Sequence, residues 1–128
     1  MKLTDLTYLR ELFGSRLQEN ISLSTYTSAR VGGPADASII TRSSQDLAEI
    51  TMQMWDKEID FIIIGGGTNL LVSDKGVHKL VVINRARATN FIESETSPHA
   101  VAESGTSMND LAQKAANLGF SGLEWAAT

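Results

Sequence analysis

The fold prediction rests on one stretch, Phe61-Ile62-Ile63-Ile64-Gly65-Gly66-Gly67-Thr68-Asn69-Leu70-Leu71-Val72. Its four bulky apolar residues in a row predict a short β-strand that is buried on both faces. A glycine costs roughly 0.5–1 kcal/mol in a regular element relative to alanine, so a run of three indicates a special backbone requirement. Such a run can form a turn with positive φ, or it can bring backbone amides close to a ligand.

Two polar residues follow the glycines. Thr68 and Asn69 add a hydroxyl and an amide that can hydrogen-bond to oxygen, and successive backbone amides with such side chains form a nest for a phosphate. The stretch lacks the Lys-Ser/Thr pair of a P-loop. It also lacks the helix that opens on the last glycine of a Rossmann fingerprint. The residues alone therefore leave two interpretations open, a phosphate loop of another architecture and a tight turn between strands.

Length and composition narrow the class of protein. The 128 residues suit one domain or part of a larger one, and a net charge of −4 argues against a nucleic-acid or anionic-membrane partner. The chain has no cysteine, which excludes thiolate catalysis and fits a cytoplasmic protein. His78 and His99 are far apart, so we expect no histidine-based metal site. No apolar run approaches the length of a membrane span.

Hydrophobic periodicity predicts the remaining elements. Residues 1–20 are expected to form an N-terminal helix, and residues 21–27 an extended segment. A strand, a helix and a strand are predicted at residues 35–41, 47–56 and 61–64, and such a crossover normally makes the strands parallel. Further along, we expect a buried strand at residues 80–83 and an antiparallel pair of strands at residues 91–96 and 100–104. A helix that Ser107 caps is expected at residues 108–118.

A second glycine motif reads Arg30-Val31-Gly32-Gly33-Pro34-Ala35-Asp36. Pro34 fixes its own φ and moves Gly33 out of the helical region, which predicts a bend. Arg30 precedes the bend and can pair with a phosphate or a carboxylate, although a surface arginine beside a turn is the alternative. A small basic cluster, Arg85 and Arg87, is interpreted as a solvated rim.

The two glycine motifs together resemble, in order and spacing, the N-terminal FAD-binding region of the UDP-N-acetylenolpyruvoylglucosamine reductase family. This family is also called UDP-N-acetylmuramate dehydrogenase, or MurB. The resemblance covers residues 21–128 and implies an FAD domain of the vanillyl-alcohol-oxidase or PCMH type. Thr68 stands where the family commonly has serine, and Ala29 where it often has phenylalanine.

The resemblance implies an α+β fold whose first half is α/β-like. It would have a small, partly parallel sheet with flanking helices, and a second sheet that is incomplete. Residues 21–128 would be a partial FAD-binding domain, with the substrate-binding domain and the family's catalytic arginine, serine and glutamate outside this chain. No catalytic residue and no metal ligand is therefore assigned. The residues expected to bind FAD are Arg30, Gly65, Gly66, Gly67, Thr68, Asn69, Leu70, Gly105 and Thr106.

The resemblance also implies the parent reaction. NADPH reduces FAD, and the flavin passes hydride to UDP-N-acetylglucosamine-enolpyruvate to give UDP-N-acetylmuramate. This step belongs to peptidoglycan synthesis, and so to cell-wall biogenesis, cell shape and cell division, with a nucleotide sugar as substrate. The chain alone is expected to be inactive, and its oligomeric state is not predicted. Two alternatives are the FAD domain of another oxidoreductase of this flavin fold, and a non-catalytic nucleotide-binding module.

Overall fold

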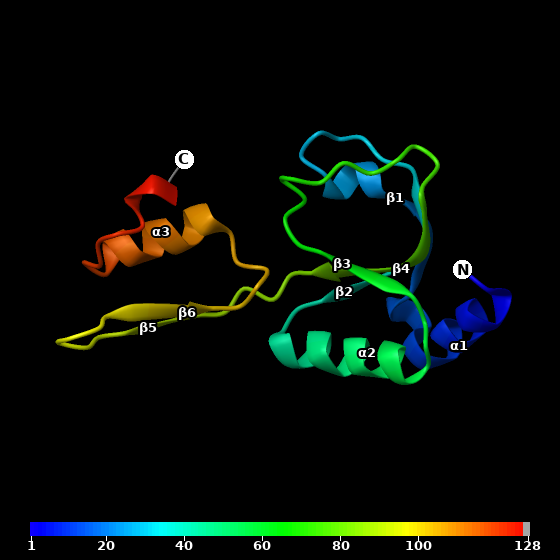
Figure 1. Ribbon diagram of the computed structural model, residues 1–128, viewed down its shortest axis with the longest axis horizontal. Coiled ribbons are helices and arrows are strands. Elements are labelled where there is room, and N and C mark those ends of the chain that lie inside the picture. Colours follow the sequence, from blue (N-terminus) through cyan, green and yellow to red (C-terminus); the bar gives the residue numbers. More distant parts are fainter. Residues whose placement is uncertain (127–128) are drawn as a thin grey trace.

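A four-stranded sheet is the centre of the larger of two lobes (Figure 1). The computed structural model describes residues 1–126. The strands lie in the order β1 (Gln18–Ser22), β2 (Pro34–Thr41), β4 (Val77–Asn84) and β3 (Phe61–Ile64). β2, β4 and β3 run parallel, whereas β1 is antiparallel to β2. We call residues 1–88 the sheet lobe and residues 89–126 the hairpin lobe.

The predicted crossover from β2 to β3 is confirmed, with β4 inserted between the two strands. The connecting helix is α2 (Ser44–Asp56). Its first turn is capped, because the Ser43 hydroxyl accepts a hydrogen bond from the Asp46 amide at 3.1 Å. Parallel strands joined by a helix place their carboxyl ends at one edge of the sheet. Any loop that follows these strands therefore starts at that edge.

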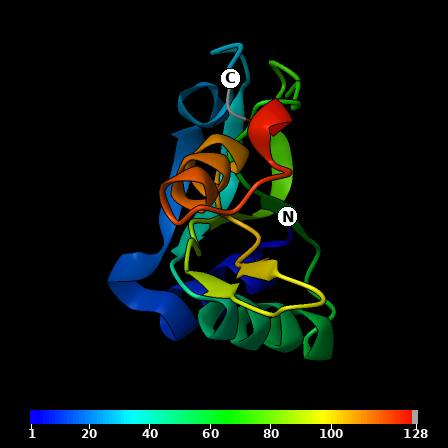
Figure 2. The ribbon, with the colours of Figure 1, turned by 90° about the vertical axis from the view of Figure 1, so that its left-hand side faces the viewer.

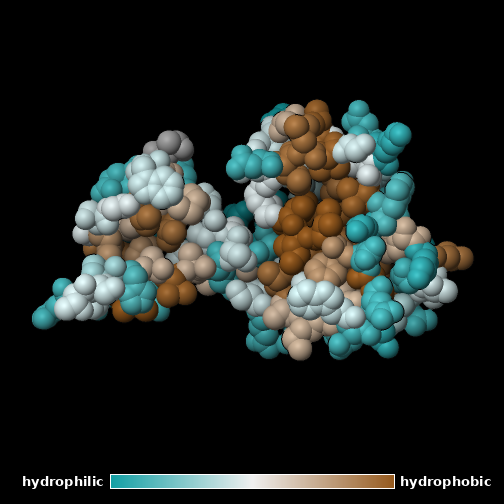
Figure 3. All heavy atoms as spheres, viewed as in Figure 1, coloured by the Kyte–Doolittle hydropathy of each residue, from teal (hydrophilic) through white to brown (hydrophobic). Residues whose placement is uncertain are grey.

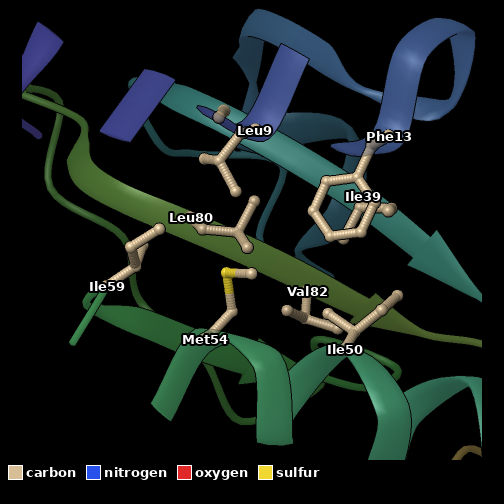
Figure 4. Packing of buried hydrophobic residues seen from close by; sticks show 9 residues of the cluster. Leu9, Phe13, Ile39, Ile50, Met54, Ile59, Leu80 and Val82 are labelled. Carbon is tan, nitrogen blue, oxygen red and sulfur yellow. The ribbon is translucent and has the colours of Figure 1, made fainter. Parts of the chain in front are cut away.

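One face of the sheet is covered by α1 (Leu3–Phe13) and α2. Because side chains alternate along a strand, every second residue of β4 points to this face. Leu80 and Val82 pack there against the two helices, as Figure 4 shows. The buried residues of this core cluster are Leu9, Phe13, Ala37, Ile39, Ile50, Met54, Ile59, Leu80 and Val82.

The opposite face is covered by loops rather than by helices (Figure 1). A 3₁₀ turn (Leu23–Tyr26) and the segment that follows β3 lie over it, and Val81 and Ile83 of β4 point toward them. The buried residues of this second cluster are Leu23, Ala35, Ile64, Val72, Val81 and Ile83. Figure 3 shows hydrophobic residues gathered between the sheet and these loops.

Three predictions about local structure are corrected. The helix predicted to residue 20 ends at Phe13, because Gly14 adopts φ +50 and a 3₁₀ turn follows. Residues 18–22 are β1, but residues 23–26 form a 3₁₀ turn instead of an extended segment. β3 is not buried on both faces: it is an edge strand, and Ile63 is 48% exposed. The strands that are buried on both faces are the two central ones, β2 and β4.

The hairpin lobe contains β5 (Thr89–Ile92), β6 (His99–Ala102) and α3 (Met108–Asn117). The two strands are antiparallel, as predicted, and Ser107 caps α3 by accepting from the Asp110 amide at 3.3 Å. Figure 1 shows this lobe beside the sheet lobe, where the chain continues from β4, and Figure 2 shows it in front of the sheet lobe. The predicted fold class is confirmed: a small, mostly parallel sheet with helices, and a separate two-stranded sheet. The last two residues of the range that the resemblance covers, 127 and 128, lie outside the described residues.

Candidate functional site

The site is built at the edge where the parallel strands end. β3 ends at Ile64 beside Ile83, and β2 ends at Thr41 beside Asn84. The segment that leaves β3, residues 65–72, is called here the glycine loop. It returns across the face opposite the helices, where Val72 is buried and Leu70 is half-buried in the second cluster. The loop is thus held at both ends by the sheet lobe.

The backbone amides of the glycine loop have no hydrogen-bond partner in the described part of the chain. Among residues 1–126, no hydrogen bond is donated by any amide from Gly65 to Val72. Two carbonyls of the loop, by contrast, accept hydrogen bonds, Gly65 from Arg85 and Gly67 from the Ser28 amide at 3.0 Å. Backbone N–H groups are strong donors that are normally paired when water is excluded. The loop therefore presents a row of free donors while its carbonyls anchor it.

The three glycines of the loop have different surroundings. A Cβ at Gly65 or Gly66 would meet no other atom within 4 Å, so the packing of the protein does not require glycine at these positions. Gly67 is different, because it adopts φ +71 and a Cβ there would collide with the Tyr26 carbonyl oxygen. Thr68 and Asn69 are exposed, and in the described part of the chain their side chains make no hydrogen bond. Space and free donors thus coincide at Gly65 and Gly66, and exposed polar side chains follow at Thr68 and Asn69.

Arg85 is a residue of this site that the sequence analysis missed. It was interpreted as part of a solvated rim, yet it is half-buried and its Nη1 donates to the Gly65 carbonyl oxygen at 3.0 Å. Its guanidinium also lies over the Tyr26 ring, 6.0 Å from the ring centre. The only sequence signal was its position, one residue after a buried strand that ends beside β3. Arg87, in contrast, is exposed, as a rim residue should be.

The structure places Arg30 close to the glycine loop through its backbone. The turn that contains it rests on the loop, because the Ser28 amide donates to Gly67 and the Arg30 amide donates to Thr27 at 3.1 Å. Arg30 has φ +54 and an exposed side chain. Within the described range 1–126, that side chain makes no hydrogen bond or ion pair. Its contact with a ligand stays a prediction.

At the second glycine motif, the space beside the glycines is filled by the backbone of another segment of the protein. The Gly33 amide donates to the Ser73 carbonyl at 2.9 Å, and a Cβ on Gly33 would collide with the Asp74 carbonyl oxygen. Gly76 has φ +82, and a Cβ there would collide with the Pro34 carbonyl oxygen. We call this junction of residues 32–34 with residues 73–76 the locked corner. Its glycines are explained by close backbone approach, without a ligand.

The predicted turn at Gly105 and Thr106 meets the same strand end as the glycine loop. The Gly105 amide donates to the Ala86 carbonyl at 2.9 Å, and the Asn84 side-chain amide donates to the Ser104 hydroxyl at 2.8 Å. In the described structure, the buried Thr106 Oγ1 has no hydrogen-bond partner. Residues 84–86 therefore connect both predicted ligand-binding turns, one through Arg85 and the other through Ala86.

Glu103 holds the two lobes together at this junction. Its two carboxylate oxygens accept from the amides of Ala88 and Ser44, both at 2.7 Å. These hydrogen bonds, the one from Ala88 first, hold the pKa of the Glu103 carboxyl below its ordinary value. Its own amide also donates to the Ala88 carbonyl at 2.9 Å. Glu103 thus fixes the position of the Gly105 turn relative to the sheet lobe.

Comparison with known proteins identifies the family. The FAD binding domain model matches residues 35–128. A UDP-N-acetylenolpyruvoylglucosamine reductase of Nostoc punctiforme is 36% identical over 110 residues, which are 86% of this chain and 33% of the relative. That of Lactobacillus delbrueckii subsp. bulgaricus is 35% identical over 127 residues, 99% of this chain and 40% of the relative. The chain thus spans well under half the length of these relatives, and the resemblance found in its motifs is confirmed.

Two solved structures have the same fold. The UDP-N-acetylenolpyruvylglucosamine reductase (MurB) of Thermus caldophilus matches with a TM-score of 0.61 and 28% identity, over 85% of this chain and 36% of that one. An alkyldihydroxyacetonephosphate synthase matches with a TM-score of 0.63 over 93% of this chain and 26% of that one. At 15% identity, the second likeness concerns the fold alone. None of the helices in residues 1–126 is both long and apolar enough to cross a membrane.

Proposed function

This chain belongs to the FAD binding domain family, and we propose that its glycine loop binds the pyrophosphate of FAD. The observation that carries the proposal is the row of unpaired amides in residues 65–72, at glycines that leave room for a ligand. Hydrogen bonds to a charged oxygen are worth roughly 1.5–3 kcal/mol each. Several such bonds from consecutive amides make an anion nest of the kind that phosphates occupy. The amides of Gly65, Gly66 and Gly67 would supply this nest.

Side chains around the nest would complete the cofactor site. Thr68 and Asn69 are exposed beside the free amides and can bond phosphate oxygens, and Leu70 continues the loop with its own free amide. The Gly105–Thr106 turn is held at the same strand end. A buried hydroxyl without a partner is unfavourable, so the Thr106 Oγ1 is suited to an atom of the cofactor. Arg30 would add a positive charge from the neighbouring turn.

The parent reaction follows from the relatives. We infer that the chain is the cofactor-binding part of an NADPH-dependent reductase that converts UDP-N-acetylglucosamine-enolpyruvate to UDP-N-acetylmuramate in the cytoplasm, for peptidoglycan synthesis. FAD would supply the hydride chemistry of that reaction. The residues of this chain would bind and orient the cofactor. The substrate is a nucleotide sugar, and we assign no residue of this chain to its chemistry.

A second candidate is the FAD domain of an oxidoreductase with another substrate. The fold likeness to alkyldihydroxyacetonephosphate synthase, at a TM-score similar to that of the MurB structure, favours it as the alternative. Both candidates need the same pyrophosphate site, because a flavin fold can serve several reactions. The substrate, and not the cofactor, separates them.

Flavin titration tests the cofactor site. FAD and riboflavin share the isoalloxazine ring, but only FAD carries the pyrophosphate. The purified chain should bind FAD at least about tenfold more tightly than riboflavin, since two or more charged hydrogen bonds are gained. ADP should compete with FAD for the same reason. Equal affinity for FAD and riboflavin, measured by flavin fluorescence, would contradict the proposal.

A turnover assay tests whether this chain binds the cofactor without containing the catalytic groups. The chain is mixed with FAD, NADPH and UDP-N-acetylglucosamine-enolpyruvate, and NADPH absorbance is followed beside one of the full-length relatives. We expect substrate-dependent turnover more than about a hundredfold below that of the relative, because no residue here is placed as proton donor to the substrate. Turnover closer to that of the relative would mean that this chain contains catalytic groups as well. Activity of the relative on the substrate is the positive control.

A further inference from the structure

Arg85 makes the one side-chain hydrogen bond that the structure shows to the glycine loop among the described residues. Its Nη1 reaches across the carboxyl end of β3 to the Gly65 carbonyl oxygen at 3.0 Å. Its guanidinium lies over the ring of Tyr26. The carbonyl oxygen of Tyr26 is the atom with which a Cβ at Gly67 would collide. The Arg85 amide is fixed as well, because it donates to the Thr41 carbonyl at 2.8 Å. Arg85 is therefore held at its backbone and, in turn, holds the start of the loop.

The bond to Gly65 also determines where the next amide points. The described chain has no cis peptide bond, and in a trans peptide the C=O and the following N–H lie in one plane and point in opposite directions. Fixing the Gly65 carbonyl on Arg85 therefore turns the Gly66 N–H away from Arg85. The Gly67 carbonyl is held by the Ser28 amide, which orients the Thr68 N–H in the same way.

The peptide between Gly65 and Gly66 needs such a restraint. Glycine has access to a wide range of φ and ψ, so a peptide flanked by two glycines can rotate easily. No Cβ contact restrains it, because both positions face open space. A rotated peptide would present its carbonyl oxygen where the Gly66 amide should meet the ligand. A carbonyl repels phosphate, whereas an amide binds it.

Arg85 also has no counterion among the described residues. Within the part of the chain that the structure describes, no carboxylate forms an ion pair with it, and one of its five N–H groups is used on Gly65. A guanidinium can form charge-assisted hydrogen bonds with a carboxylate or a phosphate. The neighbouring Arg87 is exposed, and within residues 1–126 it makes no hydrogen bond to the loop and no cation–π contact with Tyr26. The two arginines of the basic cluster are thus physically distinct.

We propose that Arg85 is the positioning residue of the FAD pyrophosphate site, because it prevents rotation of the Gly65–Gly66 peptide and keeps the Gly66 amide directed at the phosphate. The inference rests on the proposed function and adds a residue outside both glycine motifs. It predicts that loss of the guanidinium weakens binding of a pyrophosphate ligand much more than binding of riboflavin. It also predicts that the sheet lobe stays folded, since Arg85 is outside both core clusters.

The test compares Arg85→Gln and Arg85→Lys with Arg87→Gln, a matched control from the same cluster. FAD, ADP and riboflavin are titrated against each variant, and thermal unfolding is measured without ligand. Arg85→Gln should weaken FAD and ADP by about tenfold or more, while riboflavin changes by less than about twofold. Arg85→Lys keeps a cationic donor and should recover part of the lost affinity. Arg87→Gln should match the unmodified chain.

Each outcome separates this inference from the proposed function. FAD binding by the unmodified chain tests the function alone, and its absence would overturn both proposals. Normal FAD binding with no difference between Arg85→Gln and Arg87→Gln would overturn the role of Arg85 only. Equal losses for FAD and riboflavin would also overturn it, because they indicate a general structural defect. If Arg85→Gln does not fold, the ratio of FAD to riboflavin affinity in Arg85→Lys decides, and an unchanged ratio overturns the role.

Discussion

The two glycine-rich regions of the sheet lobe look alike in sequence and differ in structure. In the locked corner, Gly33 and Gly76 are glycines because the backbone of the facing segment occupies the place of a side chain. In the glycine loop, Gly65 and Gly66 face open space, and the amides around them have no partner in residues 1–126. The first region is complete without a ligand, and the second is not.

This difference shows that a glycine run has two separate physical causes. Close approach of two backbones requires glycine for stability, and close approach of a ligand requires it for binding. The locked corner also serves the glycine loop, since Gly32 packs against Val72 at the end of that loop. Substitutions in the two regions should therefore affect different measurements, stability in one and FAD affinity in the other.

The largest effect is expected in the locked corner. Gly33→Ala places a methyl group on the Asp74 carbonyl oxygen, and the backbone of one segment must move. We expect the free energy of unfolding to fall by about 2–3 kcal/mol, as for other overpacked sites. Gly65→Ala is the matched control, because its methyl group would enter open space, and it should change stability by less than about 0.5 kcal/mol. Urea unfolding measures both, and equal losses would remove the distinction between the regions.

A smaller effect, and one on binding alone, is expected in the glycine loop. Gly66→Val would fill the space in front of the free amides, so FAD affinity should fall at least about tenfold, or about 1.4 kcal/mol. The unfolding midpoint should stay close to that of the unmodified chain. Ser97→Val, in the exposed connection between β5 and β6, is the control for adding an exposed valine. An unchanged FAD titration of Gly66→Val would show that the glycine loop is not the phosphate site.

The smallest effect is expected at Glu103, which joins the Gly105 turn to the sheet lobe. The amides of Ala88 and Ser44 hold the pKa of the Glu103 carboxyl below its ordinary value. The ionised carboxylate therefore stabilises the fold at pH values above the ordinary glutamate pKa of about 4.3. This stabilisation is lost as the pH falls through the lower pKa of the folded state. Glu103→Gln should lower the thermal midpoint by a few degrees at pH 7. The difference should shrink as the pH falls below the ordinary glutamate pKa of about 4.3, and it should disappear once the pH is below the lower folded pKa, where the native side chain is also neutral. If the difference in thermal midpoint stays constant from about pH 7 down to about pH 3, the carboxylate charge does not have this role.

Local signals in the sequence determined the elements and much of the site. The apolar runs predicted β3 and β4, Ser107 predicted the start of α3, and the strand–helix–strand order predicted the parallel arrangement of β2 and β3. The two glycine motifs predicted the family and the loop that carries the free amides. These features depend on residues that are close in sequence, where periodicity and backbone preference act directly.

Contacts between distant parts of the chain were decided only by the tertiary structure. Arg85 acts on Gly65, twenty residues before it, and Glu103 reaches Ser44 across fifty-nine positions, so neither role has a local pattern. The same holds for the glycines, because only the facing backbone separates Gly33 in the locked corner from Gly66 in the open loop. It holds for β3 too, since an apolar run is the same on an edge strand and on a central one until its neighbours are placed. The sequence specifies which groups are available, and the packing of segments decides which of them are already satisfied and which remain free for a ligand.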